Sequence, residues 1–250
     1  MIGRPLVMPL LLIVLGGAGV ASAGGPTTRP QIDGYETCST EGWTVHINFK
    51  LLSEQPAKTN KAIELLTAQL KEIVRVVPER PVAHLRKVPL WINPEYPGQQ
   101  PRAEYHPDAG WLRDHGRDAR MAKCIEFTNV RIFEAECRRM PCFVLHELAH
   151  AYHDQVLGFD NAEIIAAYQH AMASGSYDAV ERNNGDRPKT VERAYAMTDH
   201  KEYFAESTEA FFGRNDFFPF TREQLRRHDP EMFRLLVRLW RVAGPTTDTN

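Results

Sequence analysis

Residues 143–152 read FVLHELAHAY, and both the fold and the chemistry that we expect follow from this stretch. In a helix, His146 and His150 project from one face, one turn apart. The residues around them are apolar, and ionisable side chains inside an apolar helix are costly to bury unless they are paired or bound to a metal. We therefore predict a helix that opens at Pro141, runs to about Leu157 and contains a metal site.

The residue types of this HExxH pattern suit zinc. Two neutral imidazoles at that separation can share one tetrahedral zinc ion, and Glu147 between them can take a proton from a water bound to the metal. A catalytic zinc needs a third protein ligand. The metzincin pattern would place glycine at position 153 and histidine at position 156, but the chain has His153 and Val156 there. That pattern is excluded, so we expect the third ligand on another segment, with His153 at the helix flank or beside a ligand.

Residues 199–212, DHKEYFAESTEAFF, are the candidate second segment. Glu202, Glu206 and Glu209 fall at i, i+4 and i+7, so a helix places three carboxylates on one stripe, where they repel one another unless a cation lies opposite. Glu202 could instead form a capping box with Asp199, and the stripe could be a solvated face. The aromatic character of the segment favours Glu202 as the third zinc ligand.

Residues 195–206, YAMTDHKEYFAE, extend this pattern upstream. Together with HELAH, the segment resembles the gluzincin zinc metalloproteases of the anthrax lethal factor type. In that family a tyrosine lies seven residues before the zinc-binding glutamate, which opens an E-[FY]-F-A-E helix, and Tyr195 and Glu202 match these positions. The resemblance covers roughly residues 123–212. Residues 207–209, STE, depart from the small or apolar residues that usually follow.

The resemblance implies a compact α+β gluzincin fold and a zinc-dependent endopeptidase that acts on a peptide or protein substrate. It implies one zinc ion per chain and the following site residues: the zinc ligands His146, His150 and Glu202, the general base Glu147, the oxyanion-stabilising hydroxyl of Tyr195, and Glu206 as the partner that orients a ligand histidine. Two alternatives stay open: a zinc hydrolase of cell-wall peptides, and a zinc-stabilised binding protein without catalysis. No toxin-delivery domain is recognisable, so a toxin role does not transfer.

Hydrophobic periodicity predicts a small sheet followed by a helical C-terminal half, which is the α+β class. The expected elements are strands at 43–49, 88–92 and 123–130, helices at 61–77, 162–173, 199–212, 221–227 and 229–242, and a long loop at 93–120. The resemblance implies that the strand at 123–130 forms the rim of the cleft, where a peptide could add to it as a further strand. A plain edge strand or an interior strand without contact to substrate is the alternative. Tyr105 and Trp111 could line substrate subsites, but a surface loop is favoured because aromatic residues alone do not mark a site.

Residues 1–23 have the pattern of a secretory signal peptide. Arg4 supplies the positive charge, residues 6–20 are apolar, and Ala21-Ser22-Ala23 is a small-residue cleavage site. The apolar run is too short and too interrupted for a spanning helix, so we expect no stable membrane insertion after cleavage. The expected product is a secreted or periplasmic protein with a flexible lead-in at 24–40, one metallopeptidase-like domain at 41–243 and a tail at 244–250.

Four cysteines could form disulfide bonds in the oxidising compartment that export implies. They lack CxxC spacing, which argues against a zinc knuckle or a thioredoxin-like motif. We expect a structural bridge, with the pairing open, among Cys38, Cys124, Cys137 and Cys142.

The composition is that of a globular protein, since 43% of the 250 residues are hydrophobic and 25% are charged. The formal net charge is −2, so there is no basic excess, which argues against nucleic acid as a partner. The chain that remains after signal cleavage is long enough to bury one sizeable core.

Overall fold

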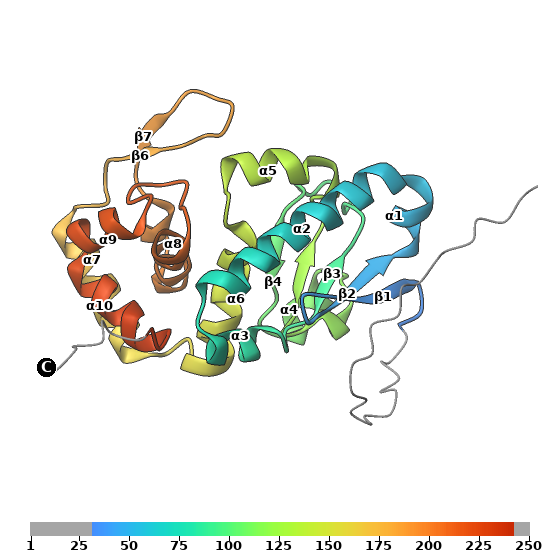
Figure 1. Ribbon diagram of the computed structural model, residues 1–250, viewed down its shortest axis with the longest axis horizontal. Helices are drawn as coiled ribbons and strands as arrows, with labels where there is room; N and C mark the ends of the chain where they lie inside the picture. The colour runs from blue at the N-terminus through green and yellow to red at the C-terminus, as the bar shows by residue number, and fades with distance from the viewer. Residues whose placement is uncertain (1–31, 243–250) are drawn as a thin grey trace, which may run out of the picture. The chain divides into compact units, whose positions relative to one another are not determined.

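A mixed five-stranded sheet and a group of helices make up the structure (Figure 1). The computed structural model describes residues 32–242, so the predicted signal peptide, residues 24–31 of the lead-in and the tail at 244–250 lie outside the described residues. In the spatial order β1-β2-β3-β5-β4, the strands are β1 Tyr35–Thr40, β2 Trp43–Asn48, β3 Leu90–Ile92, β5 Ile125–Phe127 and β4 Ala103–Tyr105. The small N-terminal sheet and the helical C-terminal half confirm the expected α+β class.

The predicted helices are present, with ends that differ by a few residues. The α-helices are α1 Phe49–Glu54, α2 Pro56–Val76, α3 Glu79–Leu85, α4 Ala109–Asp114, α5 Phe133–Arg139, α6 Phe143–Tyr152, α7 Ala162–Ser174, α8 His200–Phe212, α9 Arg222–His228 and α10 Pro230–Leu239. Shorter elements are the 3-10 helices η1 Ala119–Met121, η2 Val130–Ile132 and η4 Tyr195–Met197, the π-helix η3 His153–Leu157, and a hairpin of β6 Val180–Arg182 and β7 Thr190–Glu192.

Part of the predicted lead-in is a strand. Residues 35–40 form β1, which pairs antiparallel with β2 across the whole strand. Glu41 and Gly42 connect the two with positive φ angles of 50° and 93°, the conformation that a tight two-residue hairpin turn requires. β1 is an edge strand and most of its residues are only half-buried. Its apolar alternation is therefore too weak to predict a strand from the sequence.

β5 lies inside the sheet, and β4 forms the edge. β5 pairs parallel with β3 on one side and antiparallel with β4 on the other. The expectation that the strand at 123–130 forms the rim was therefore wrong: all three residues of β5 are buried. The rim strand β4 comes from residues 93–120, which were expected to form a loop, because a three-residue strand is too short to show a period of two.

α6 packs between α2, which lies on the sheet side, and α8. The buried positions of α2 recur at helical spacing and are Thr59, Ala62, Leu66, Leu70 and Ile73. In α6 every residue is buried except Glu147 and His150. A helix that is apolar almost all round belongs in the middle of the fold, and the two exceptions are the residues that face a cleft.

Aromatic packing holds the C-terminal helices against α6. The ring of Trp240 stacks on Tyr152 at a centroid distance of 4.2 Å and on Phe204 of α8 at 6.0 Å. The Trp240 indole N–H also donates to Thr208 at 3.2 Å. Each large apolar side chain buried in this way contributes about 1.5–3 kcal/mol to folding. This cluster sets the position of α8 relative to α6.

The expected disulfide bridge is absent: residues 32–242 contain no disulfide bond. Cys124 packs in a small cluster with Trp91 and Met121. Cys137 and Cys142 line an apolar cavity against α2, where their sulfur atoms accept hydrogen bonds from the Gln69 side chain and the Arg214 backbone N–H. These thiols are thus used in packing on separate elements.

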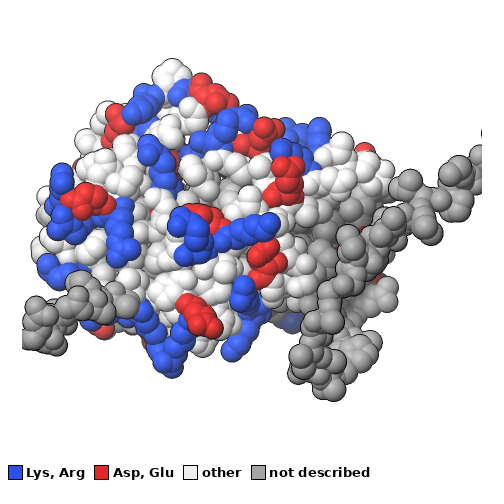
Figure 2. All heavy atoms as spheres, in the orientation of Figure 1, with Lys and Arg blue, Asp and Glu red and all other residues white. Residues whose placement is uncertain are grey.

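On the face drawn in Figure 2, neither charge sign is concentrated in one patch. On the face in Figure 2, Lys and Arg side chains are interspersed with Asp and Glu. This mixture agrees with the near-neutral composition of the chain. Within residues 32–242 there is no helix whose length and apolar character would let it cross a bilayer.

Candidate metal centre

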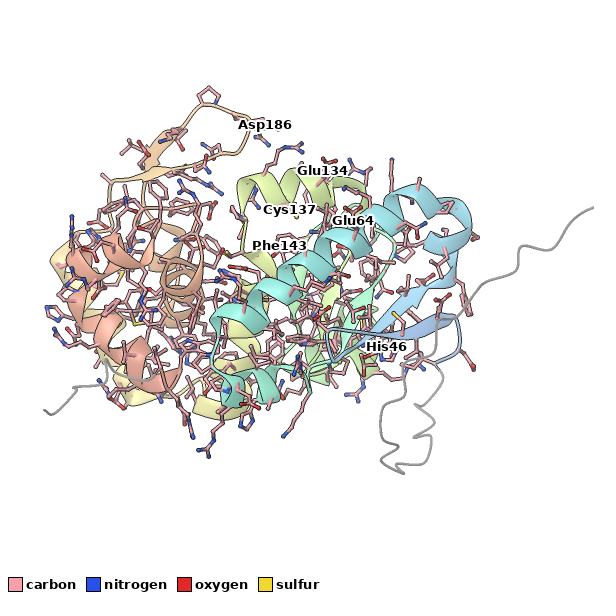
Figure 3. The ribbon with its side chains drawn as sticks, in the orientation of Figure 1. His46, Glu64, Glu134, Cys137, Phe143 and Asp186 are labelled. Atoms are coloured by element: carbon pink, nitrogen blue, oxygen red, sulfur yellow. The ribbon has the colours of Figure 1, made fainter. Side chains whose placement is uncertain are left out.

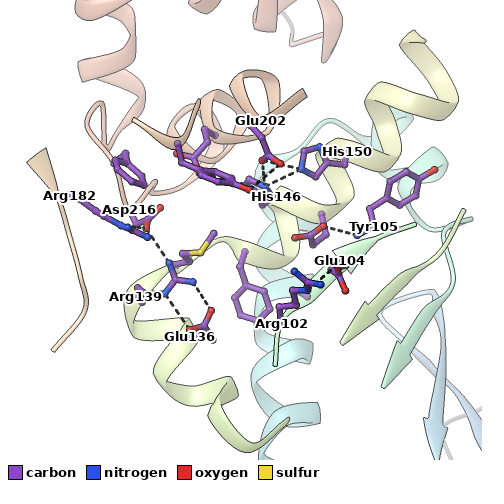
Figure 4. A pocket seen from close by; sticks show the side chains of 17 residues that line it. Arg102, Glu104, Tyr105, Glu136, Arg139, His146, His150, Arg182, Glu202 and Asp216 are labelled. Atoms are coloured by element: carbon purple, nitrogen blue, oxygen red, sulfur yellow. Dashed lines mark hydrogen bonds and ion pairs between the residues drawn. The ribbon is translucent and has the colours of Figure 1, made fainter. Parts of the chain in front are cut away.

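Three side chains from two helices converge at one point of the fold. Nε2 of His146 lies 3.1 Å from Nε2 of His150 and 3.0 Å from Oε2 of Glu202, and the remaining pair is 3.4 Å apart (Figure 4). The helical period of α6 brings the two histidines together, and the packing of α8 on α6 brings Glu202 to them. Asp199 caps α8 with its own carboxylate, while the Glu202 carboxylate faces the histidines rather than the cap.

The donor atoms and their spacing fit a zinc ion. Zinc bonds to imidazole nitrogen and carboxylate oxygen are about 2.0–2.2 Å long, so two ligands of a tetrahedral ion lie about 3.3–3.6 Å apart, within a few tenths of an ångström of the separations found here. The three separations observed are 3.0, 3.1 and 3.4 Å. A tetrahedral ion with three protein ligands keeps one position for water or substrate.

Glu209 rather than Glu206 makes the hydrogen bond to the outer nitrogen of His146. Nδ1 of His146 lies 2.8 Å from Oε1 of Glu209 and 3.9 Å from Oε1 of Glu206. Burial opposes the charged imidazole, but the bonds to Glu202 and Glu209 outweigh it and raise the pKa of His146 well above its usual value. Glu206 and Glu209 are both buried, so the stripe is not a solvated face. The environment of His146 favours a positive charge at this place.

Glu147 is held by the backbone of the edge strand. Its Oε2 accepts a hydrogen bond of 2.8 Å from the N–H of Tyr105 in β4. Burial raises the pKa of Glu147, although His146 and His150 pull it down. A carboxyl group whose pKa lies above that of an exposed glutamate is a better proton acceptor near neutral pH.

Tyr195 lies over the same point from η4. Its hydroxyl is 3.4 Å from Oε1 of Glu202, and the residue is 47% exposed. Burial of the hydroxyl end, together with the Glu202 carboxylate, raises the pKa of Tyr195 to about 12. The phenol is therefore protonated at neutral pH and can donate a hydrogen bond.

These groups line one cleft of about 460 Å³. One wall is formed by β4 and its approach, residues 102–105. The opposite end is formed by charged residues of α5, β6 and the segment after α8, which Figure 4 shows on the far side of His146 from Tyr105. The sequence had not indicated this second end, because its members come from three separate segments.

A buried charge network lies beneath β4. Nη1 of Arg117 is 2.6 Å from Glu104 and 3.0 Å from Glu126, and Nε2 of His106 is 2.9 Å from the same Glu126 oxygen. Glu104, His106 and Glu126 are close enough to one another to suit a cation, but the Arg117 guanidinium already lies among them. Residues 93–120 are thus more than a surface loop. Tyr105 lines the cleft.

Two other aromatic side chains have packing roles. Trp111, which could have lined a subsite, stacks on His115 at 4.0 Å and is not part of the cleft lining. His153 is fully buried against Phe159 and Phe204 and makes no hydrogen bond with a described residue. Burial lowers the pKa of His153 to about 3, so its ring is neutral.

Comparisons of this chain with protein-family profiles, with characterised proteins and with solved structures give no significant match.

Proposed function

We propose that this chain is a secreted zinc-dependent endopeptidase of the gluzincin type. The observation that supports this most is the convergence of His146, His150 and Glu202 beside a half-buried Glu147 whose carboxylate accepts from the Tyr105 N–H. A structural zinc usually has four protein ligands, whereas this group has three among the described residues and opens into a cleft. A purely structural site would need neither Glu147 nor Tyr195 in that cleft. Secretion rests on the residue pattern of positions 1–23.

The chemistry follows from the roles of the side chains. A zinc ion held by the two histidines and Glu202 would polarise the scissile carbonyl and lower the pKa of a bound water toward ~7. Glu147 takes a proton from the water as the water oxygen attacks the carbonyl carbon. Glu147 then passes that proton to the amide nitrogen as the C–N bond breaks. The Tyr195 hydroxyl donates a hydrogen bond to the carbonyl oxygen as negative charge develops there. The products are a carboxylate and an amine.

The edge strand β4 suits an extended peptide. β4 is the last strand of the sheet and lines the cleft beside the Glu147 carboxylate. An exposed strand edge presents backbone N–H and C=O groups that a peptide can pair with. We expect the substrate to lie along β4 with its scissile bond next to Glu147 and Tyr195.

The test combines a metal measurement with a peptide library. Purified protein should bind about one zinc per chain and cleave peptides in a way that a chelator abolishes. Glu147→Gln should keep the zinc and lower kcat by about 10²–10⁴-fold, because the proton acceptor is lost. Glu64→Gln, at an exposed residue of α2, is the matched control and should leave both the zinc content and kcat unchanged.

Three outcomes would contradict the proposal. Protein without zinc would remove its basis, and undiminished cleavage by Glu147→Gln would reject the general base. Zinc binding with no peptide cleaved would support a zinc-stabilised binding protein. If cell-wall peptides were hydrolysed and protein-derived peptides were not, the substrate class would change while the metal chemistry stayed.

A further inference from the structure

The end of the cleft beside α5 has charged walls. Arg139 comes from the end of α5, Arg182 from β6, and Asp216 from the segment that follows α8 (Figure 4). Asp216 accepts from Arg139 at 3.4 Å and from Arg182 at 3.3 Å. Glu206 of α8 also lines this part of the cleft, so it is continuous with the candidate metal centre.

The β6–β7 hairpin contributes Arg182 to this end of the cleft and contacts α5 with its tip. Its tip residue Asp186 pairs with Arg138 of α5 at 2.9 Å, and Figure 3 labels Asp186 at the end of the hairpin that extends toward α5. Gly185 has a φ of 66°, and a Cβ built there would lie 3.3 Å from backbone atoms of Arg139. The hairpin tip thus packs closely on α5. This end of the cleft, the pocket, is lined by the charged side chains of Glu136, Arg139, Arg182, Glu206 and Asp216, which suit a polar or charged substrate side chain.

Two carboxylates in this pocket each have an oxygen without a partner. Glu206 accepts from Asn215 at 2.9 Å with one oxygen, but its Oε1 makes no hydrogen bond with a described residue. The same holds for Oδ1 of Asp216. Both residues are 1% exposed. A buried carboxylate oxygen without a hydrogen-bond donor is unfavourable in free energy, and a donor bound in the pocket would offset this cost.

Glu206 has less cationic support than the other carboxylates of the pocket. Its cations are Arg139 and Arg182, and its carboxylates are Glu136, Asp216 and Glu206. Glu136 pairs with Arg139 at 2.7 Å and Asp216 lies between the two arginines. The cation beside Glu206 is His146, whose Nδ1 lies 3.9 Å from Oε1 of Glu206 and bonds to Glu209 at 2.8 Å. Buried charges in proteins are normally paired. A group with positive charge and several N–H donors would complete this set, because Oε1 of Glu206 and Oδ1 of Asp216 accept no hydrogen bond from a described residue.

We propose that this pocket binds the cationic side chain of a substrate residue, lysine or arginine, next to the scissile bond. An ammonium or guanidinium group can donate to both of these oxygens and place a further positive charge beside Glu206. The role of the pocket in substrate selection rests on the proposed peptidase function. The preference of the pocket for a cationic side chain can still be measured by peptide binding without cleavage.

The first experiment compares peptides that differ only at the residues flanking the scissile bond. Lysine is replaced by norleucine, which has the same chain without the charge, or by glutamate. At one of the two positions the lysine peptide should have a kcat/KM on the order of tenfold or more above norleucine, with glutamate the poorest. Equal values for lysine and norleucine at both positions would overturn the pocket assignment while leaving the peptidase proposal intact.

Asp216→Asn and Glu206→Gln should each reduce the lysine-to-norleucine ratio toward one. Glu192→Gln is the control, because Glu192 lies 3.7 Å from Arg182 but is exposed on β7 and is not part of the cleft lining. The ratio should be unchanged in that variant. Thermal melting shows which variants fold. If Asp216→Asn does not fold, Glu206→Gln alone tests the proposal. A lysine-to-norleucine ratio in Glu206→Gln equal to that of the wild type would contradict it.

A binding measurement separates this inference from the peptidase proposal. Zinc-loaded Glu147→Gln is titrated with the lysine and norleucine peptides by calorimetry. Tighter binding of the lysine peptide, again on the order of tenfold, would support the pocket even if the wild type cleaves no peptide. Equal affinity for the two peptides would overturn it whether or not cleavage occurs.

Discussion

The backbone N–H of Tyr105 donates a hydrogen bond of 2.8 Å to Oε2 of Glu147, and this bond joins the edge strand of the sheet to the helix that carries both histidines. A bond from the main chain keeps its direction whatever the side chain at position 105. Glu147 also lines the cleft. We infer that β4 positions the proton acceptor as well as one wall of the site.

Removal of that N–H should lower activity. Tyr105→Pro and Tyr105→Ala both remove the phenol, which donates to Asp154, but only proline removes the N–H. Proline is tolerated on an edge strand. We expect kcat of the proline variant to be about tenfold or more below that of the alanine variant, since a hydrogen bond to a charged group is worth about 1.5–3 kcal/mol. Equal kcat values in two folded, zinc-loaded variants would contradict the role of the N–H.

Zinc affinity should depend more on Glu209 than on Glu206. Glu209 makes the 2.8 Å bond to Nδ1 of His146, whereas Glu206 lies at 3.9 Å. Loss of such a supporting carboxylate weakens metal binding about 10–100-fold. Glu209→Gln should therefore raise the zinc Kd by that factor, and Glu206→Gln by much less, as measured by competition with a chelating dye. A larger rise in zinc Kd for Glu206→Gln than for Glu209→Gln would mean that Glu206 is the carboxylate that supports His146.

Tyr195→Phe should lower kcat by about 10²–10³-fold with little change in KM or zinc content, because the hydroxyl acts on charge that develops during the reaction. Steady-state kinetics on the best library peptide would measure both constants. Tyr168→Phe removes a hydroxyl that bonds to the Met197 carbonyl outside the cleft lining, and should leave kcat unchanged. An unaltered kcat in Tyr195→Phe would exclude this role.

The free energy of unfolding should fall as the pH drops below about 6.5, in part through His153. Burial lowers its folded pKa to about 3 from a usual value of about 6.5, so between these values the unfolded chain binds a proton that the folded chain does not. This favours unfolding by up to about 1.4 kcal/mol per pH unit.

His153→Phe should make the free energy of unfolding depend less steeply on pH between pH 4 and about 6.5. Denaturant unfolding of the metal-free wild type and variant between pH 4 and pH 7 would give the slopes, and the contributions of the other histidines cancel in the difference. Identical slopes would mean that His153 is protonated in the fold or solvated in it.

The sequence allowed the main helices to be predicted because their apolar residues recur at the period of a helix. It also predicted that His146 and His150 face the same way, since a spacing of four is a property of one helix. The strand β4 could not be predicted, because three residues are too few to show a pattern. The expected disulfide was wrong because cysteine count and compartment say nothing of which elements lie together.

Residue spacing within α8 could not predict whether Glu206 or Glu209 hydrogen-bonds to His146. Both lie on one stripe of α8, and the sequence predicted that stripe correctly. Which carboxylate reaches His146 depends on how far α8 is shifted along α6, and that shift is set by contacts such as Trp240 with Phe204. Spacing within a helix follows from backbone geometry, so the sequence by itself determined it. Distances between helices follow from the packing of side chains far apart in the chain, so only the tertiary structure decided them.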